Sequence, residues 1–274
     1  MPPDKFKATW LSHSSISDFQ KCPRLYYYRN VYKDPITGHK ITRAQPALAL
    51  GGAVHDVIES LSMLPVEERF SISPLKKFDV VWENNKGKKG GFKSKEEEDI
   101  FYERGREMIQ RVIDNPGPLL NKAVKISQEL PYFWLNEEEN IILCGKVDWL
   151  EYLPQTDSVH IIDFKTGRNE EEDDSMQLPI YNLLVTNTQK RNVEKASYWY
   201  LTKDNKPREV ELPDLKESHS KIYDIGKRIR LARQIEHFSC PRGGCIFCNP
   251  MEDIAKGKGE LIGEDRYRHD IYIL

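Results

Sequence analysis

Several features that would place a protein in a membrane or outside the cell are missing from this sequence. It has no run of about 18 apolar residues, so no segment is expected to span a bilayer. The opening residues, MPPDKFKATW, lack the apolar stretch of a secretory signal peptide. Cysteine is scarce, and the odd total of five argues against a disulfide framework. We therefore expect a cytoplasmic protein with no membrane partner.

Neither sign of charge dominates the composition. Of the 274 residues, 31% are charged, and the formal net charge is only -2. Such a balance does not exclude nucleic-acid binding, which depends on where basic residues cluster. The hydrophobic fraction of 39% is sufficient for a substantial core. The chain shows no internal repeat and no long low-complexity linker, so its length predicts one large domain or a core with elaborations.

Helical periodicity is visible in five segments. The pattern Ser15-Ile16-Ser17-Asp18 predicts a capped helix start, and Pro23 should kink or restart that helix. In the second helix, His55 and Glu59 share one face at i,i+4 spacing. The further helices that we expect cover residues 47–64, 96–114, 175–188 and 214–236.

The middle of the chain changes to the period of β-strands. The second and third strands are separated by a turn-forming segment at 154–158 and should form a hairpin. Helices before and after these strands predict an α/β fold with a mixed central sheet flanked by helices. The expected strands are residues 124–135, 140–153, 158–165 and 196–202.

Two carboxylates and an ammonium group are concentrated on the predicted hairpin. Asp163 and Lys165 alternate with Phe164, so they should point to the same face of their strand. Asp148, on the neighbouring strand, should lie beside them if the hairpin pairs in register. Carboxylate oxygens bind Mg²⁺ or Mn²⁺, which can activate a water for phosphodiester hydrolysis, and the lysine can orient or deprotonate that water.

A D-x-K triplet alone also fits an ordinary surface ion pair. The apolar residues before Asp148 and Asp163 favour buried carboxylates instead, and such groups are costly without partners.

The chain resembles the RecB-like PD-(D/E)XK nucleases in five ordered segments. GKVDWL, IIDFKTG and Gln177-Leu-Pro-Ile-Tyr181 look like successive motifs of that family, and Gly51-Gly52-Ala53-Val54-His55 resembles its preceding G-x-x-x-H helix. The opening LSHSSISDFQKCPRLYYY is similar to the start of its iron–sulfur members. The resemblance extends from residue 12 to about residue 181, and it implies a restriction-endonuclease-like core.

The resemblance also implies roles for individual residues. His55, Asp148 and Asp163 would bind Mg²⁺ or Mn²⁺, together with a backbone carbonyl near Phe164, and Lys165 would be the catalytic lysine. By itself, His55 also fits a solvated helix residue.

Gln177 and Tyr181 lie one helical turn apart. The resemblance implies that they face the site and contact DNA or position the lysine. Without it they would be an ordinary helix face.

Four of the cysteines, Cys22, Cys240, Cys245 and Cys248, suggest a second centre. In the family that the chain resembles, one N-terminal and three C-terminal cysteines bind a [4Fe–4S] cluster, so we expect such a cluster here. Structural zinc is the alternative, because four thiolates also suit that ion. The spacing C-x4-C-x2-C departs from the usual C-x2-C-x5-C, and Ile254 stands where the last cysteine would fall.

The fifth cysteine, Cys144, lies within an apolar run and is expected to be buried without a ligand role.

These patterns predict a single RecB-like nuclease domain over residues 1–274. Residues 1–46 form its N-terminal helical part with Cys22, and residues 206–274 supply a C-terminal helix and the cysteine cluster. The core covers 47–205 and includes a mobile basic loop at 84–95.

The expected function is a divalent-metal-dependent DNA exonuclease that acts on single-stranded ends. The word exonuclease rests on resemblance to CRISPR-associated and phage-encoded members, which also implies DNA repair or recombination, or CRISPR adaptation. Two alternatives stay open. One is a catalytically weak or inactive nuclease-like DNA-binding subunit of a helicase or integrase complex, and the other is a zinc-stapled structural or adaptor protein.

Overall fold

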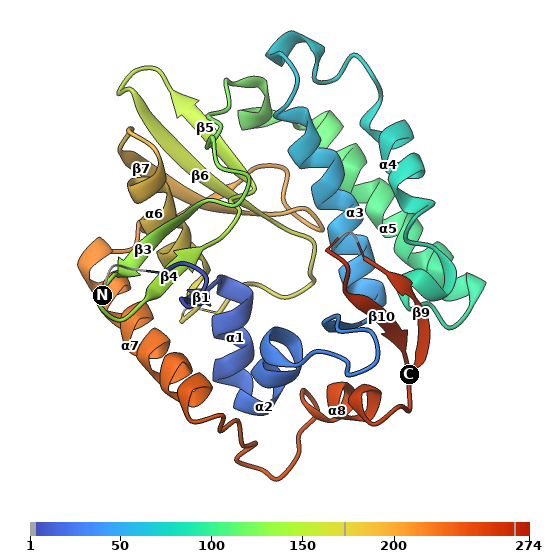
Figure 1. Ribbon diagram of the computed structural model, residues 1–274. Coiled ribbons are helices and arrows are strands. Elements are labelled where there is room, and N and C mark those ends of the chain that lie inside the picture. Colours follow the sequence, from blue (N-terminus) through green and yellow to red (C-terminus); the bar gives the residue numbers. More distant parts are fainter. Residues whose placement is uncertain (1–3, 173, 266) are drawn as a thin grey trace. The chain divides into compact units, whose positions relative to one another are not determined.

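A computed structural model describes residues 4–172, 174–265 and 267–274 of the chain (Figure 1). The chain divides by packing into two compact units. The central unit consists of Gln45–Pro131 and Lys146–Pro213, and the terminal unit of Met1–Ala44, Tyr132–Gly145 and Asp214–Leu274. The expectation of one domain over the whole length stays a prediction. Within the described part of the chain, no helix combines the length and apolar character needed to cross a membrane.

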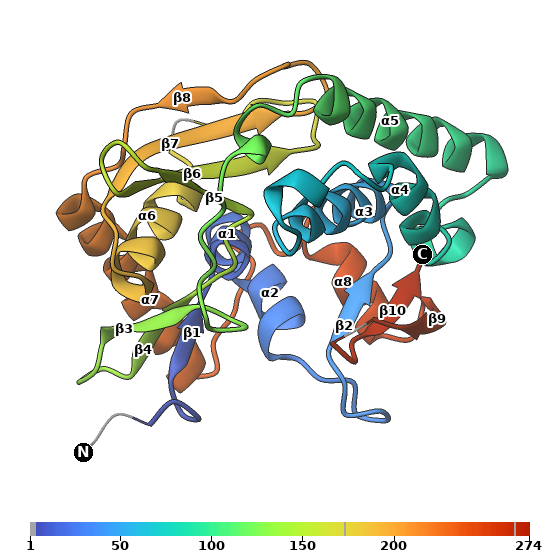
Figure 2. The ribbon, with the colours of Figure 1, turned by 90° about the horizontal axis from the view of Figure 1, so that it is seen from above.

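A four-stranded mixed sheet forms the framework of the central unit. Its strand order is β5-β6-β7-β8 (Figure 2). The β5–β6 and β7–β8 pairs are antiparallel, whereas β6 and β7 run parallel and are connected through helix α6. The strands are β5 (Trp149–Leu153), β6 (Ser158–Lys165), β7 (Val193–Tyr200) and β8 (Arg208–Val210). The expected α/β fold with a mixed sheet is confirmed.

Helices cover this sheet because its strands alternate buried side chains between two faces. From one face, Ile162, Phe164 and Trp199 pack into the main hydrophobic core with residues of α3, α4 and α5. Burying one such side chain contributes roughly 1.5–3 kcal/mol. The helices are α3 (Pro46–Leu61), α4 (Pro74–Trp82), α5 (Lys95–Asp114) and α6 (Gln177–Thr188), with 3₁₀ turns at Val66–Glu68, Gly87–Gly90 and Gly117–Leu120.

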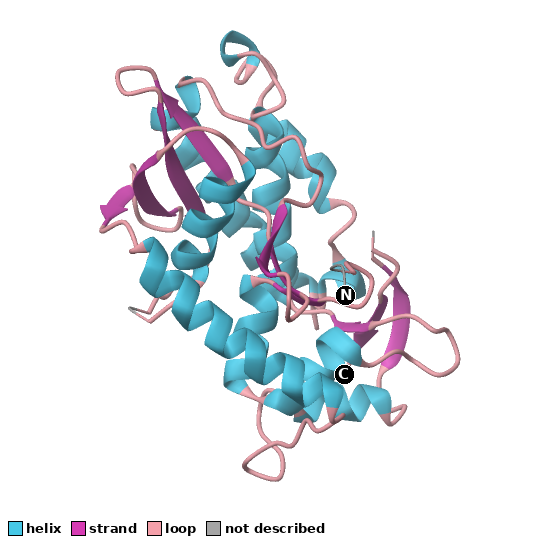
Figure 3. Cartoon of the chain, turned by 60° about the vertical axis from the view of Figure 1, so that its left-hand side comes forward, coloured by secondary structure: helices cyan, strands magenta, loops and turns pink. Residues whose placement is uncertain are grey.

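The terminal unit contains the other two sheets, of three strands each (Figure 3). Their orders are β1-β4-β3 and β2-β10-β9. The strands are β1 (Thr9–Leu11), β2 (Ile41–Arg43), β3 (Tyr132–Asn136), β4 (Ile141–Cys144), β9 (Glu260–Glu264) and β10 (Asp270–Ile273). The helices are α1 (His13–Lys21), α2 (Pro23–Tyr26), a π-helix at Tyr27–Val31, α7 (Leu215–Gln234) and α8 (Asn249–Ala255).

The predicted strand 140–153 is wrong as a single element. The chain leaves extended pairing between Cys144 and Trp149, so β4 and β5 belong to different sheets. The strand predicted at 124–135 is also wrong in its extent, because the sheet strand in this region is only Tyr132–Asn136. Apolar sequence favours extended backbone, but it does not specify which strand will be the hydrogen-bonding partner.

Two local predictions also need correction. Helix α1 begins at His13, and its capping box joins Ser12 to Ser15 rather than starting at Ser15. The segment 84–95 was expected to be a mobile basic loop, but it contains a 3₁₀ turn and packs Phe92, which is only 5% exposed, against Trp82. The restart of the first helix at Pro23 is confirmed, with the proline at the first turn, where its missing N–H costs little.

Candidate active site and metal centre

The β5–β6 hairpin brings the two predicted aspartates next to each other. Trp149 pairs with Ile162, and continuing this antiparallel register by one residue places Asp148 opposite Asp163. Asp148 was predicted to lie on this strand, but it immediately precedes the first strand residue. Its Oδ2 accepts a hydrogen bond from the backbone N–H of Phe164 at 2.9 Å, which fixes the carboxylate at the end of the hairpin.

Asp163 is a nearly inaccessible carboxylate, only 1% exposed. Its Oδ1 accepts a hydrogen bond from Gln177 Nε2 at 2.6 Å. Its Oδ2 forms an ion pair with Lys165 Nζ at 3.0 Å. Burial, followed by the nearby charge of Asp148, raises the pKa of the Asp163 carboxyl. Two carboxylates side by side, one of them fully buried, fit a position that a hard cation would occupy.

Lys165 is held by acceptors on three sides. Its Nζ lies 3.0 Å from Asp163 Oδ2 and 2.5 Å from Glu171 Oε2, and it donates to Gln177 Oε1. It also lies over the Tyr198 ring, 5.0 Å from the centroid. Burial alone would lower the pKa of Lys165, but Asp163 and Glu171 raise it overall. The side chain is therefore an ammonium ion at neutral pH.

Gln177 connects the acidic and basic groups of the site. Besides Asp163 and Lys165, it contacts Tyr181, whose hydroxyl lies 3.2 Å from Gln177 Nε2. Both residues come from α6, at the i,i+4 spacing expected from the sequence. The structure thus places Gln177 and Tyr181 beside the carboxylate–lysine pair.

His55 reaches the aspartates from helix α3. Its Nδ1 lies 3.4 Å from Asp148 Oδ2. Burial alone would lower the pKa of His55, but the charge and hydrogen bond of Asp148 raise it to about 9. Gly51 lies one turn earlier, and a Cβ there would be 3.2 Å from Thr166 Oγ1, so glycine eases the close approach of helix and strand end.

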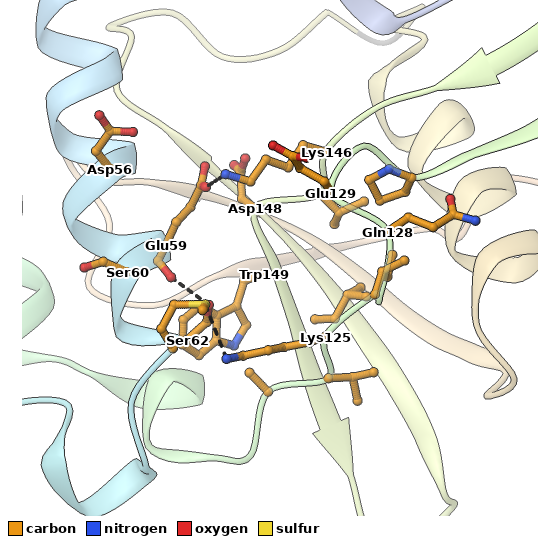
Figure 4. Close-up of a pocket in the computed structure, with 17 residues that line it drawn as sticks. Asp56, Glu59, Ser60, Ser62, Lys125, Gln128, Glu129, Lys146, Asp148 and Trp149 are labelled. Atoms are coloured by element: carbon orange, nitrogen blue, oxygen red, sulfur yellow. Dashed lines mark hydrogen bonds and ion pairs between the residues drawn. The ribbon is translucent and has the colours of Figure 1, made fainter. Parts of the chain in front are cut away.

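Glu59 is an acidic neighbour to which the sequence assigned no role. Ligand atoms of His55, Glu59 and Asp148 all lie within 4.8 Å of one another. Asp163 is not part of this closest group, although its charge affects the pKa of His55. Glu59 also forms an ion pair with Lys146 (Figure 4). The only local signal for Glu59 was its i,i+4 spacing from His55.

A cavity of about 400 Å³ begins at Asp148. Figure 4 shows its walls, which come from the C-terminal half of α3, the segment 123–131 and residues 146–150. Lys125 and Lys146 supply positive charge, whereas Trp149 contributes an indole Nε1 that is buried without a hydrogen-bond partner among the described residues.

A second polar cluster crosses the same sheet away from these groups. His160 contacts Glu151 Oε2 at 2.8 Å through Nδ1 and Ser197 Oγ at 2.7 Å through Nε2. The sequence Glu151–His160–Ser197 resembles a hydrolytic triad, but Ser197 is buried and does not line the cavity at Asp148. We interpret this cluster as hydrogen-bond satisfaction within the core.

Within the terminal unit, the four predicted cysteines converge. Their sulfur atoms lie within 4.8 Å of one another, and the Sγ atoms of Cys245 and Cys248 are 3.5 Å apart. Burial raises the pKa of Cys22, whereas for Cys245 it is outweighed by backbone N–H groups of Cys248 and Phe247, which lower the pKa to about 7. The cluster contains Cys22, Cys240, Cys245 and Cys248.

The two residues singled out beside this cluster are apolar in character. Ile254 is buried next to the cysteines and packs with Met251 in the same hydrophobic cluster. Cys144 lies on β4, away from the four-cysteine group, and burial raises its pKa to about 11. The upstream Cys240 therefore completes the group of four, and Cys144 is buried as expected.

Comparison with known proteins agrees with this architecture. The family model of the PD-(D/E)XK nuclease superfamily matches residues 10–249, which include the hairpin, α3 and α6. No curated protein matches the chain. Members of the superfamily are generally metal-dependent nucleases that act on DNA. The chain therefore belongs to the PD-(D/E)XK nuclease superfamily.

Proposed function

We propose that this protein is a RecB-like, divalent-metal-dependent DNA nuclease that removes nucleotides from single-stranded ends. The observation that carries the proposal is the convergence of Asp148, Asp163, Lys165 and His55 at one end of the hairpin. Three of these side chains offer oxygen or imidazole ligands, and the fourth offers a positive charge. This combination suits phosphodiester hydrolysis.

In this proposal Asp148, Asp163 and His55 hold Mg²⁺ or Mn²⁺, with a backbone carbonyl near Phe164. The cation would supply the Lewis acidity that activates a water and offsets charge on the phosphate. Binding requires a neutral imidazole and two ionised carboxylates, so protons must leave His55 and Asp163.

Lys165 contributes a fixed positive charge in this proposal. Its raised pKa supports an ammonium that orients the attacking water and stabilises the phosphate in the transition state, rather than a general base. Gln177 holds the ammonium and the Asp163 carboxylate at a set separation by contacting both. Tyr181 in turn supports Gln177.

The cavity beside Asp148 supports a substrate with a free strand end. Its volume, about 400 Å³, lies in the range of pockets that take up one small molecule, such as a single nucleotide. Lys125 and Lys146, which line the cavity, can meet phosphate oxygens. A strand entering there would place its neighbouring phosphate next to Asp148.

For the four-cysteine centre, sulfur spacing supports a single structural zinc ion over the [4Fe–4S] cluster. Thiolates bound tetrahedrally to one zinc at about 2.3 Å are about 3.8 Å apart. The observed 3.5 Å between Cys245 and Cys248, and the 4.8 Å limit for the group, agree with that value. Four irons between the thiolates would require a wider arrangement.

The nuclease proposal is tested with end-labelled single strands, closed single-stranded circles and blunt duplexes. We expect Mn²⁺ or Mg²⁺ to support release of mononucleotides from the linear strands alone, and EDTA to abolish it. Asp163→Asn should eliminate cleavage but retain DNA binding. Asp157→Asn, in the exposed turn of the same hairpin, is the matched control and should cleave normally.

Three results would count against the proposal. Cleavage of circles would overturn the exonuclease assignment. Normal turnover by Asp163→Asn would overturn the active-site assignment. DNA binding without cleavage in the unaltered protein would instead indicate the binding subunit of a helicase or integrase complex.

A further inference from the structure

Glu59 lies where a ligand of the same cation would be expected. On α3 it follows His55 by four residues, and its Oε1 is 3.9 Å from His55 Nδ1. His55 Nδ1 is in turn 3.4 Å from Asp148 Oδ2, so the three side chains enclose one small space. Ligands bound to Mg²⁺ at about 2.1 Å are about 3.0 Å apart when adjacent and about 4.2 Å apart when opposite. The observed separations are of this size.

The Glu59 carboxylate is also poorly solvated, with its side chain only 19% exposed. It shares this confined space with the Asp148 carboxylate, and two negative charges in low dielectric repel each other. The ammonium of Lys146 contacts Glu59 Oε2 and relieves part of that repulsion. A lysine in this position carries one positive charge, where a divalent cation would carry two.

The position of Lys146 allows its ammonium to leave Glu59 when a cation binds. Its side chain is 62% exposed, and the residue lies in the non-strand connection before β5. It also lines the cavity that begins at Asp148. Because the lysine end of this ion pair is exposed, its ammonium is readily rehydrated when it leaves, and a divalent cation at Glu59 replaces the charge that is lost.

We propose that Glu59 is an additional ligand of the divalent cation, and that Lys146 occupies Glu59 until the cation binds. This rests on the metal site of the proposed function and extends its ligand set. Arrival of the cation displaces the Lys146 ammonium from Glu59 toward the cavity, where a phosphate oxygen is its natural partner. Metal binding thereby prepares the positive charge that receives the DNA strand.

The test measures Mn²⁺ affinity of the full chain without DNA, by calorimetry and by electron paramagnetic resonance of free Mn²⁺. We expect Glu59→Gln to weaken binding by more than about tenfold, since a charged ligand is lost. Lys146→Met should strengthen it by about twofold to tenfold, since a competing cation is lost. Glu103→Gln and Lys76→Met, both exposed residues of the central unit, are the matched controls and should not change it.

The double variant separates competition at Glu59 from a general charge effect. If Lys146 competes through Glu59, Lys146→Met should give no gain in the Glu59→Gln background. An equal gain in both backgrounds, or unchanged affinity in folded Glu59→Gln, would overturn the inference.

The variant Asp163→Asn distinguishes failure of the Glu59 inference from failure of the proposed metal site. Weaker binding in Asp163→Asn with full binding in Glu59→Gln would refute the role of Glu59 and leave the proposed function intact. Absence of Mn²⁺ binding by the unaltered protein would refute both.

Discussion

Affinity for Mn²⁺ should rise steeply with pH, because the proposed ligands hold protons that the metal must displace. In the metal-free protein, Asp148 raises the pKa of His55 to about 9, from its usual value near 6.5. At pH 7, only about one molecule in a hundred then carries the neutral imidazole that binds metal. Each unit of pH up to about 9 should therefore strengthen binding about tenfold.

Asp163 adds to this dependence in the same direction. Burial and the charge of Asp148 raise its pKa, so a fraction of the carboxyl is protonated where an ordinary aspartate would be ionised. Over the pH range where Asp163 titrates, binding of one cation releases up to two protons. The Mn²⁺ affinity should therefore rise between tenfold and a hundredfold per unit of pH.

The metal-free protein should show the opposite trend in stability. The contribution of protonated His55 is fully present below pH 6.5, its unfolded pKa, and is lost as the pH rises through about 9. This loss is on the order of a few kcal/mol. The melting temperature in EDTA should therefore fall over that interval, while Mn²⁺ restores it increasingly well.

Calorimetric titrations from about pH 6.5 to about pH 8.5, in two buffers of different ionisation enthalpy, measure both affinity and proton release. We expect one to two protons released per cation. His55→Gln should bind more weakly and release about one proton fewer. An affinity that stays constant within a factor of about two across this range would refute the assignment of His55 and Asp163 as ligands.

Three further outcomes follow from the contacts. Lys165→Met should reduce cleavage of labelled single strands by about 10²–10³-fold without weakening Mn²⁺ affinity, because it removes a charge that acts on the phosphate. Lys165→Arg should not restore the rate, since a planar guanidinium places its donors differently. Cys22→Ser should remove the bound metal ion and lower the melting temperature, whereas the control Cys144→Ser should retain one zinc per chain by elemental analysis. A brown protein that contains iron would contradict the choice of zinc. Phe92→Ala should lower the free energy of unfolding by about 3–5 kcal/mol in denaturant titrations, whereas Phe6→Ala, at an exposed position, should leave it unchanged. A negligible effect at Phe92 would show that the basic segment is not part of the core.

The long helices and the catalytic hairpin were predictable because their signals are local. Residues 96–114 and 214–236 approximate α5 and α7, where apolar periodicity and the N-caps Ser94 and Asp214 act within a few residues. The strand 158–165 and its turn were also correct, since alternation and turn residues specify a hairpin at short range.

Short strands escaped the sequence analysis for the converse reason. Elements such as β1, β2 and β8 contain three residues each, too few to show a period, and β1 and β2 also pair with partners far away in the chain. The prediction of one strand across Cys144–Trp149 likewise missed a change of sheet.

The sequence by itself determined which side chains are available for chemistry. It identified Asp163 and Lys165 as neighbours on one strand face, because the two-residue period of a strand is a local property. It also identified the four cysteines. Tertiary structure alone decided how these groups meet: that Asp148 binds the Phe164 amide, that Gln177 contacts both Asp163 and Lys165, and that Lys146 neutralises Glu59. These contacts join residues from different elements, and their energies depend on distance and burial, which no local pattern encodes.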